Sequence, residues 1–269
     1  MTLIETICLG IIQGLTEFLP VSSSGHLVVA KHILGFREPE LLLDTALHFG
    51  TLMAVCLYFR SDLLQMIAEL GQLIRPGRGG RDVPGPDAGL ALMVAVGSIP
   101  TGLIGIAFRH PLESLFGSVA AVGMMLIATG IIVGITRFIP PAYGRRTRVT
   151  VLFALAIGTA QGLAIMPGIS RSGATIVCGL VLGLDRDLAG RFSFILCIPA
   201  IVGALLLQLD MGAVNRVGAA ALIVGFAVSA IVGFLALKLL MRMVRQGHLY
   251  YFAPYCWALG ILTVYHLNN

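Results

Sequence analysis

The sequence predicts an all-α polytopic membrane protein built as an inverted repeat, with six transmembrane helices and two re-entrant helix-break-helix hairpins. Three observations predict this fold class. Of the 269 residues, 57% are hydrophobic and only 12% are charged, whereas soluble domains carry about 25% charged residues. Several apolar segments are long enough to cross a bilayer. A polar motif near the N-terminus also recurs in the second half of the chain, which indicates an internal repeat.

Apolar segments approach the length of about 20 residues that a spanning helix needs. In chain order the predicted spans are 41–59, 88–108, 115–136, 192–209, 217–237 and 249–267. Four of them, 88–108, 115–136, 192–209 and 217–237, contain no charged residue, and 249–267 contains a single histidine near its end. The predicted span 41–59 carries Asp44 and His48 one helical turn apart. We interpret this pair as a structural hydrogen bond rather than as the edge of a functional site.

Shorter apolar segments are predicted to form two hairpins instead of spans. The two pairs cover 2–19 with 22–34, and 150–166 with 170–184. Pro20 ends the first helix of one pair and Pro167-Gly168 ends that of the other, and the serines that follow are good N-caps. Irregular backbone inside a membrane is tolerated only where protein or a water-filled cavity satisfies its polar groups. Breaks in corresponding halves therefore indicate an inverted repeat with its site at their interface.

The chain is expected to be one integral membrane domain, with repeat halves of about 1–140 and 148–269. Positive residues in short loops mark the cytoplasmic side. In the predicted topology that side receives Arg60, Arg75, Arg78, Arg81, Arg137, Arg145, Arg146, Arg148, Arg186, Arg191, Lys238, Arg242 and Arg245. The other side receives Lys31, Arg37, Arg109 and Arg216. Both termini and the first hairpin are then expected to lie outside, the second hairpin enters from the cytoplasm, and 75–87 forms a flexible cytoplasmic loop.

Polar groups concentrate at the two predicted breaks. The first motif reads Gln13-Gly-Leu-Thr-Glu-Phe-Leu-Pro-Val-Ser-Ser-Ser-Gly-His26, and the second reads Gln161-Gly-Leu-Ala-Ile-Met-Pro-Gly-Ile-Ser-Arg-Ser-Gly-Ala174. Aligned without a gap, they share the opening Gln-Gly-Leu and the later Ser-x-Ser-Gly. Such groups are expensive to bury in hydrocarbon unless they line a wet cavity. The motifs therefore predict a functional site.

The motifs contain what a phosphate site needs. A serine-rich turn that opens a helix offers backbone N–H groups and the positive end of the helix dipole to phosphate oxygens. Arg171 adds a planar donor fork suited to phosphate. The predicted substrate-binding residues are Gln13, Ser22, Ser170, Ser172 and Thr175. For Ser24 and Ser172 we favour a role as helix caps, and an i−4 backbone bond explains Thr175 equally well.

The predicted catalytic residues are Glu17, Ser23, His26 and Arg171. Glu17 can hold a divalent cation, Mg²⁺ or Ca²⁺, or accept a proton from a nucleophile. Gln13, one turn earlier, can reach the same cation, while a structural role for Gln13 and Gln161 across the repeat interface is an equal alternative. His26 can act as a base, an acid or a phosphate acceptor. Spacing does not decide whether Ser23, His26 or water attacks.

The motifs resemble the two signature motifs of the undecaprenyl-pyrophosphate phosphatase family, which is associated with bacitracin resistance, and the resemblance covers nearly the whole chain. It implies a hydrolase of the bacterial inner membrane that converts a C55 isoprenoid pyrophosphate to undecaprenyl phosphate and inorganic phosphate for cell-wall synthesis. It also implies a divalent metal and a site open to the periplasmic side. Glu17 matches the family's acidic position, and Gln13 a position that accepts Glu or Gln. The family's other polar positions match Ser23, His26, Ser170, Arg171 and Thr175.

Two other functions fit parts of the pattern. A lipid-phosphate flippase would use the same inverted repeat and broken helices. Acid-phosphatase-like membrane phosphatases also use Ser-Gly-His, but the chain has no matching Lys-rich first motif or His-x-x-x-Asp third motif. Nucleic-acid binding is not expected, because no basic stripe alternates with aromatics. The expected partners are a lipid pyrophosphate and membrane lipids, and a homodimer stays open.

Overall fold

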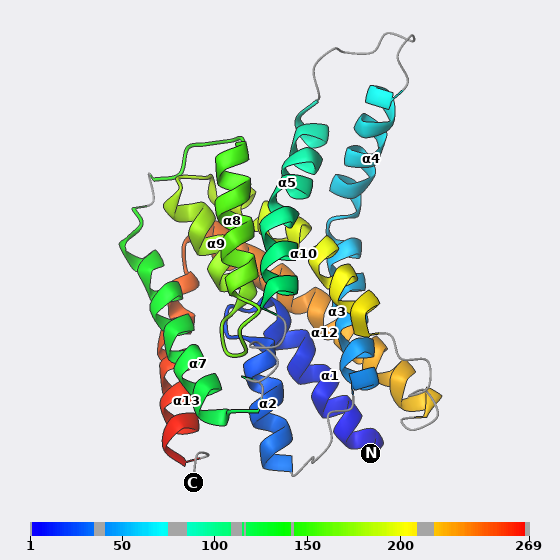
Figure 1. Cartoon of the computed structure of the whole chain (residues 1–269), viewed down its shortest axis with the longest axis vertical. Coiled ribbons are helices and arrows are strands. Elements are labelled where there is room, and N and C mark those ends of the chain that lie inside the picture. Colours follow the sequence, from blue (N-terminus) through cyan, green and yellow to red (C-terminus); the bar gives the residue numbers. More distant parts are fainter. Residues whose placement is uncertain are drawn as a thin grey trace.

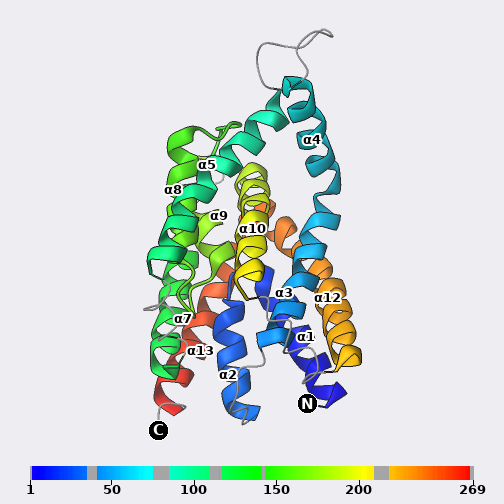
Figure 2. The ribbon, with the colours of Figure 1, turned by 45° about the vertical axis from the view of Figure 1, so that its right-hand side comes forward.

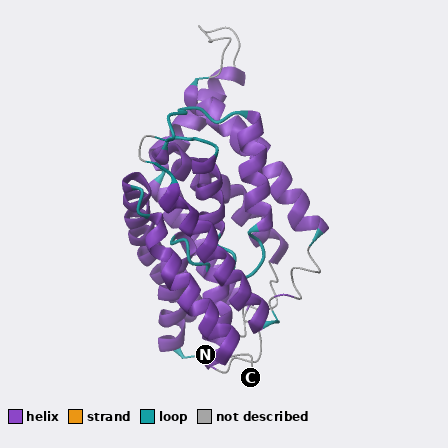
Figure 3. Ribbon diagram, turned by 90° about the vertical axis from the view of Figure 1, so that its left-hand side faces the viewer, coloured by secondary structure: helices purple, strands orange, loops and turns teal. Residues whose placement is uncertain are grey.

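The chain folds into helices joined by turns. The computed structural model describes residues 2–34, 41–74, 85–108, 115, 117–140, 143–208 and 218–266. In chain order the helices are α1 (Leu3–Phe18), α2 (Ser23–Leu34), α3 (Leu41–Tyr58), α4 (Arg60–Ile74), α5 (Pro86–Ala107), α7 (Val119–Gly134), the 3₁₀ helix η1 (Ile135–Phe138), α8 (Val151–Leu163), α9 (Arg171–Val181), α10 (Arg186–Gln208), α12 (Ala219–Gln246), the 3₁₀ helix η3 (Leu249–Phe252) and α13 (Ala253–His266). The described ranges contain no β-strand (Figure 3).

Several of these helices can cross a membrane. By length and apolar composition, the candidates are α5, α7 continued into η1, α10 and α12, and the bent pair α3 and α4 makes a fifth. The last predicted span forms η3 and α13, and the 14 residues of α13 rise only about 21 Å. The prediction of an all-α polytopic membrane protein is confirmed, whereas the number of six spanning helices is not.

Helix α4 was not predicted. It bends from α3 by 73°, and it escaped notice because Asp62 and Glu69 interrupt its apolar residues. The Glu69 carboxylate caps the start of α5, since Oε2 accepts hydrogen bonds from the backbone N–H of Asp87 at 3.1 Å and of Ala88 at 2.7 Å. Asp87, which we assigned to a loop, therefore lies in the first turn of α5.

Helix α10 begins earlier than predicted. Asp185 Oδ1 accepts hydrogen bonds from the backbone N–H of Asp187 and Leu188, which caps the helix ahead of the apolar run. Arg191, which we assigned to a loop, consequently lies within α10. Its Nε atom is 2.5 Å from Asp62 Oδ1, and its guanidinium also pairs with Asp87. These ion pairs join α4, α5 and α10.

Some of the predicted loop residues cannot be placed. Arg37, Arg75, Arg78, Arg81, Arg109, Arg216 and the segment 75–84 lie outside the described residues, and so does the side chain of Lys31. The helix ends that the structure describes can be assigned to the two ends of the bundle. The start of α1 and the end of α13 lie at one end of the bundle, and the end of α4 and the start of α5 lie at the other (Figures 1 and 2).

Large apolar side chains cover the outside of the helices. Those with the most exposed surface include Ile4, Leu103, Ile106, Phe138, Ile223, Ile231 and Tyr265. Soluble monomers rarely expose contiguous apolar patches beyond a few hundred Å². The exposed residues lie on α1, α5, η1, α12 and α13, so the outer surface as a whole suits hydrocarbon rather than water.

The two predicted hairpins enter the bundle from opposite ends (Figures 1 and 2). Helix α1 runs inward from the end where the chain starts and α2 returns to that end, while α8 and α9 do the same from the other end. Their breaks coincide with Pro20 and Pro167-Gly168, as predicted. The breaks touch, because a Cβ atom built on Gly25 would lie 3.2 Å from Gly168 Cα. The predicted meeting of the two interrupted helices is confirmed.

The two halves of the chain interlock. Helix α1 of the first half packs along α12 of the second, and α8 of the second half packs along α5 of the first. Small residues permit both contacts: a Cβ on Gly14 would lie 2.8 Å from Val232 Cβ, and one on Gly97 would lie 2.9 Å from the Ala154 carbonyl oxygen. Each hairpin is thus held by a long helix of the other half. The division into halves near residues 140–148 stays a prediction.

The last helix of each half also binds the break of the other half. In α7, Thr129 Oγ1 donates to the Gly168 carbonyl oxygen at 2.7 Å and accepts from the Ser170 N–H at 2.9 Å. In α13, Cys256 Sγ donates to the Pro20 carbonyl oxygen at 3.6 Å. Pro20 and Gly168 are equivalent positions of the aligned motifs. These contacts satisfy break carbonyls that no helix satisfies, which is the condition for irregular backbone inside a membrane.

The contact between α5 and α8 gives a first testable prediction. A Cβ atom on Gly158 would collide with the carbonyl oxygen of Gly97, and Thr101 Oγ1 donates to the Gly158 carbonyl oxygen at 2.8 Å. Gly158→Ala is therefore expected to destabilise the protein by about 1–3 kcal/mol, measured as a lower midpoint of thermal unfolding in detergent. The control is Gly102→Ala, because a Cβ on Gly102 meets nothing within 4 Å. Equal midpoints for the two variants would contradict this packing.

Candidate active site

Glu17 lies at the centre of the meeting point of the two breaks. It is in the last turn of α1, and only 3% of its side chain is exposed. Its Oε2 atom accepts hydrogen bonds from Gln13 Nε2 at 2.9 Å and from Ser23 Oγ at 2.7 Å. The spacing of four residues places Gln13 and Glu17 on one face of α1. The structure thus brings three of the predicted site residues together within the first motif.

Arg171 joins the second motif to the first. It is the first residue of α9, and its Nη2 atom donates to Glu17 Oε1 in an ion pair that links the two hairpins. The Arg171 side chain is 21% exposed, against 3% for that of Glu17. The structure thus brings together two of the predicted catalytic residues, Glu17 and Arg171. The first repeat supplies the carboxylate, and the second supplies the guanidinium.

The serines that cap the helices differ from those that we favoured. Ser22 Oγ accepts a hydrogen bond from the Gly25 N–H at 3.2 Å, and Ser170 Oγ accepts one from the Gly173 N–H at 3.1 Å. The predicted caps, Ser24 and Ser172, instead bond to these hydroxyls at 3.2 Å each. The reason is geometric, since a cap lies just outside the first helical turn and its oxygen reaches the N–H three residues later.

Backbone strain accompanies the first break. Ser22 has a φ of 71°, a left-handed conformation that non-glycine residues adopt rarely. Gly168 of the second break has a φ of 96°, and a Cβ there would lie 2.5 Å from the Val122 carbonyl oxygen, so only glycine fits. Strain of this kind clusters at functional sites. Both breaks are held in conformations that their surroundings impose.

His26 lies in α2, and a residue that the sequence analysis missed contacts it. Its Nδ1 atom is 2.7 Å from the Ser22 carbonyl oxygen, which can only accept, so Nδ1 carries the proton. Its Nε2 atom is 2.7 Å from the Tyr255 hydroxyl of α13. The two rings also stack, with centroids 5.7 Å apart and an angle of 9° between their planes. No hydrogen bond or ion pair within the described residues links His26 to Glu17 or Arg171.

His48 forms the predicted hydrogen bond to Asp44, and it also borders the site. It lies on α3, and its Nδ1 donates to the backbone carbonyl oxygen of Asp44 at 2.8 Å. Its Nε2 atom points towards the site, 3.8 Å from Glu17 Oε2. That separation exceeds a direct hydrogen bond and suits one bridging ligand atom or water. The i, i+4 spacing was visible in the sequence, but only the fold shows that this face of α3 meets α1.

The remaining predicted residues have structural partners. Thr175 Oγ1 donates to the Arg171 carbonyl oxygen at 2.8 Å, the backbone bond that was the alternative to substrate binding, and it also bonds to Ser193 Oγ. Gln161 Nε2 donates to Thr101 Oγ1 and to the Leu196 carbonyl oxygen, both at 3.3 Å. Gln161 therefore joins helices, as the structural alternative predicted, while Gln13 faces the carboxylate.

The site is closed by its own ion pair. Glu17, Arg171, Ser172, Ser193, Phe194 and Cys197 line the space between the breaks. This space is too narrow to admit a water molecule, so the wet cavity that we predicted is not open in this conformation. The space is narrow because the Arg171 guanidinium lies directly against the Glu17 carboxylate.

The residues around Glu17 suit one divalent cation with few protein ligands. No group of three or more His, Cys, Asp or Glu side chains able to hold a metal occurs in the described part of the chain. Gln13 Oε1, however, is buried and lacks a hydrogen-bond donor there. A carboxylate and an amide oxygen are hard oxygen ligands, and Mg²⁺ commonly takes one or two carboxylates together with water and substrate phosphates. This donor set fits that pattern.

The chain is similar to known proteins over almost its full length. A model of the family described as bacitracin resistance protein BacA matches residues 6–262. The undecaprenyl-diphosphatase of Desulfosudis oleivorans is 48% identical over 269 residues, which cover 97% of each chain. Those of Desulfatibacillum aliphaticivorans and Methanobrevibacter smithii are 46% and 40% identical, and the alignments cover at least 96% of each chain. With this extent of match, the chain belongs to the bacitracin resistance protein BacA family.

Proposed function

We propose that this protein is an undecaprenyl-pyrophosphate phosphatase, which hydrolyses a C55 isoprenoid pyrophosphate to undecaprenyl phosphate and inorganic phosphate. The observation that carries the proposal is the ion pair between Glu17 and Arg171, with Ser23 bonded to the same carboxylate. It combines an anion ligand, a base and a hydroxyl nucleophile at one point inside the membrane. The names of the relatives agree with this reaction.

Substrate binding would replace the ion pair. The diphosphate is an anion that competes with Glu17 for the Arg171 guanidinium, and a bidentate contact to phosphate is at least as favourable as one to a carboxylate. Arg171 would then stabilise the charge that develops on the phosphoryl oxygens in the transition state. The positive end of the α9 helix dipole lies at Arg171 and would add to this stabilisation.

Ser23 is the nucleophile that the geometry favours. Its hydroxyl donates to Glu17 Oε2 at 2.7 Å, so the carboxylate can take the proton while Oγ attacks the terminal phosphorus. The bond between that phosphorus and the bridging oxygen breaks, and undecaprenyl phosphate leaves with the proton from Glu17. Water then hydrolyses the phosphoserine and restores the hydroxyl. Both ring nitrogens of His26 have other partners, which makes His26 the weaker candidate.

A divalent cation would be held by Gln13 Oε1 and the Glu17 carboxylate. When bound, such a cation neutralises charge on the diphosphate oxygens. We also propose that the site opens to the periplasmic side of the bacterial inner membrane, with both termini on that side. The support for this orientation is the excess of Lys and Arg predicted on the opposite side.

Reconstitution separates the phosphatase from a flippase. Full-length protein in vesicles is given undecaprenyl pyrophosphate and Mg²⁺, and inorganic phosphate release and movement of the lipid across the bilayer are measured together. Phosphate release in detergent as well as in vesicles is the expected result. Lipid translocation with no phosphate release from either preparation would reject the phosphatase in favour of the carrier.

Tyr255 is expected to support catalysis through His26. Tyr255→Phe keeps the stacked ring but removes the hydroxyl that bonds to Nε2. Because a neutral hydrogen bond contributes about 0.5–1.5 kcal/mol, kcat for phosphate release should fall by about two- to tenfold with little change in unfolding midpoint. The control is Tyr251→Phe in η3, whose side chain is exposed. Identical kcat values for the two variants would show that the Tyr255 hydroxyl is not used.

A further inference from the structure

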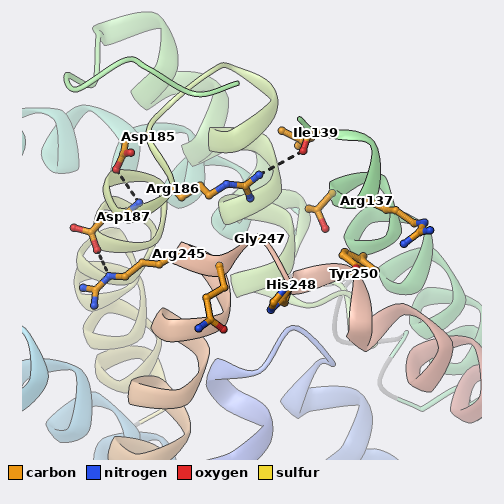
Figure 4. A pocket seen from close by; sticks show the side chains of 11 residues that line it. Arg137, Ile139, Asp185, Arg186, Asp187, Arg245, Gly247, His248 and Tyr250 are labelled. Atoms are coloured by element: carbon orange, nitrogen blue, oxygen red, sulfur yellow. Dashed lines mark hydrogen bonds and ion pairs between the residues drawn. The ribbon is translucent and has the colours of Figure 1, made fainter. Parts of the chain in front are cut away.

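A second cavity lies at one end of the bundle, away from the two breaks. Its volume is about 530 Å³. It is formed where η1, the start of α10 and the end of α12 with η3 come together, and the lining residues are drawn in Figure 4. It shares no lining residue with the space around Glu17 and Arg171. The cavity is therefore distinct from the candidate active site.

The cavity has more positive than negative charge available to a ligand. Its two carboxylates are engaged by the protein: Asp185 caps α10, and Asp187 Oδ1 accepts from Arg245 Nε at 2.6 Å. Arg137 and Arg186 also line the cavity, and neither has a carboxylate partner among the residues that the structure describes. The three arginines and two aspartates that line the cavity leave a formal excess of one positive charge.

Arg186 is positioned with a free donor. Figure 4 shows its side chain reaching from α10 towards η1, where Nη2 donates to the Ile139 carbonyl oxygen at 3.4 Å. The Nη1 atom is buried and has no acceptor within the described chain. Gly247 ends α12 with a φ of 77°, and a Cβ there would lie 3.0 Å from Nη1, so glycine leaves the room that the guanidinium occupies. A buried unpaired donor of this kind is costly unless a ligand satisfies it.

Arg137 completes a two-arginine arrangement. It comes from η1 and lies over the ring of Tyr250, with Cζ 5.2 Å from the ring centroid. This contact holds the guanidinium at the cavity without using its hydrogen-bond donors. The neighbouring Phe138 has 82% of its surface exposed, and Tyr251 is 57% exposed. These two exposed aromatic residues directly follow Arg137 and Tyr250 in the chain.

We propose that this cavity binds a phosphate group, either as the headgroup of an anionic phospholipid or as inorganic phosphate. Planar guanidinium donors match phosphate oxygens in number and geometry. Basic pockets between membrane helices take phospholipid headgroups in this way. The volume leaves room for a group larger than inorganic phosphate, and the exposed Phe138 provides a surface for acyl chains. A bound phosphate group joins η1, α10 and α12, so it stabilises the fold.

The test measures the thermal unfolding midpoint of the full-length protein in neutral detergent. One series titrates inorganic phosphate against chloride at equal ionic strength, and another titrates phosphatidylglycerol against phosphatidylcholine in the micelles. The variants are Arg186→Gln and Arg137→Gln, and Arg242→Gln is the matched control because it removes an exposed charge from the same end of α12. Arg171→Gln is included because phosphate can also bind at the breaks.

The expected result is stabilisation by at least one probe, with the half-saturating concentration raised about tenfold or more in Arg186→Gln and Arg137→Gln. The response should persist in Arg242→Gln and in Arg171→Gln. A response to phosphatidylglycerol alone identifies a lipid headgroup, and a response to phosphate alone identifies the free anion. The proposal is overturned if wild-type protein responds to neither probe, or if only Arg171→Gln loses the response. Arg137→Gln keeps the test valid if Arg186→Gln does not fold.

Discussion

Replacing Arg171 with glutamine is expected to lower kcat for phosphate release from undecaprenyl pyrophosphate by about 100- to 1,000-fold and to raise KM. Arg171 supplies the positive charge that faces Glu17 across the two breaks, and its donors would bind the diphosphate in both the ground state and the transition state. Glutamine keeps a donor but loses the charge and the fork geometry. Steady-state phosphate release at saturating Mg²⁺ measures both constants.

Loss of folding has to be separated from loss of chemistry. Removing one partner of a buried ion pair destabilises proteins by about 3–5 kcal/mol, and only 3% of the Glu17 side chain is exposed. Arg191→Gln is the matched control, because Arg191 is 25% exposed and pairs with Asp62 and Asp87 away from the breaks. It should lose stability and keep kcat. If Arg171→Gln retained kcat within about threefold of Arg191→Gln, roughly 0.6 kcal/mol, the role of Arg171 would be wrong.

Replacing Glu17 with glutamine is expected to lower kcat by about 100- to 10,000-fold while KM stays close to its original value. The amide can still accept a hydrogen bond from Ser23, but it cannot take the hydroxyl proton. It also releases Arg171 to bind the diphosphate, which offsets the weaker cation binding, so KM should change little at saturating Mg²⁺. The same assay therefore distinguishes the two variants by their KM.

Thr16→Val provides the control for Glu17→Gln. Thr16 neighbours Glu17 on α1 and is nearly buried, but its Oγ1 donates only to the Ile12 carbonyl oxygen, at 2.6 Å, among the described contacts. This variant should keep kcat within about twofold, well below 1 kcal/mol. Normal turnover by purified Glu17→Gln would exclude Glu17 as the base and would direct attention to His48, whose Nε2 atom lies 3.8 Å away.

Much of the site could be predicted because its signals are local. Pro20 and Pro167-Gly168 end helices through their own backbone restrictions, and the repeated Ser-x-Ser-Gly places an N-cap after each break. The predicted caps, Ser24 and Ser172, lie two residues after the observed caps, Ser22 and Ser170, so that choice was wrong. Helix ends are difficult to predict for the same reason, as the early start of α10 illustrates.

The residues that were missed act over long sequence separations. Tyr255 lies 229 positions from His26, and no pattern within either motif indicates that α13 passes the first break. His48 was visible as a partner of Asp44, but its second nitrogen faces Glu17 only because α3 packs against α1. The amphipathic α4 was overlooked because its charges are compensated by Arg191 and by the start of α5, which are also distant in sequence.

The sequence by itself determined that the chain is an all-α membrane protein with two helix breaks and a phosphate-binding inventory, because hydrophobic length, proline and serine act on their immediate neighbours. The tertiary structure alone decided that α1 packs on α12 and α8 on α5, that the Arg171 guanidinium closes the site against Glu17, and that Arg186 lies beside Gly247 with a buried donor that lacks a described acceptor. These features depend on which helix faces which, and that is set by small-residue contacts and buried charge pairs between distant segments.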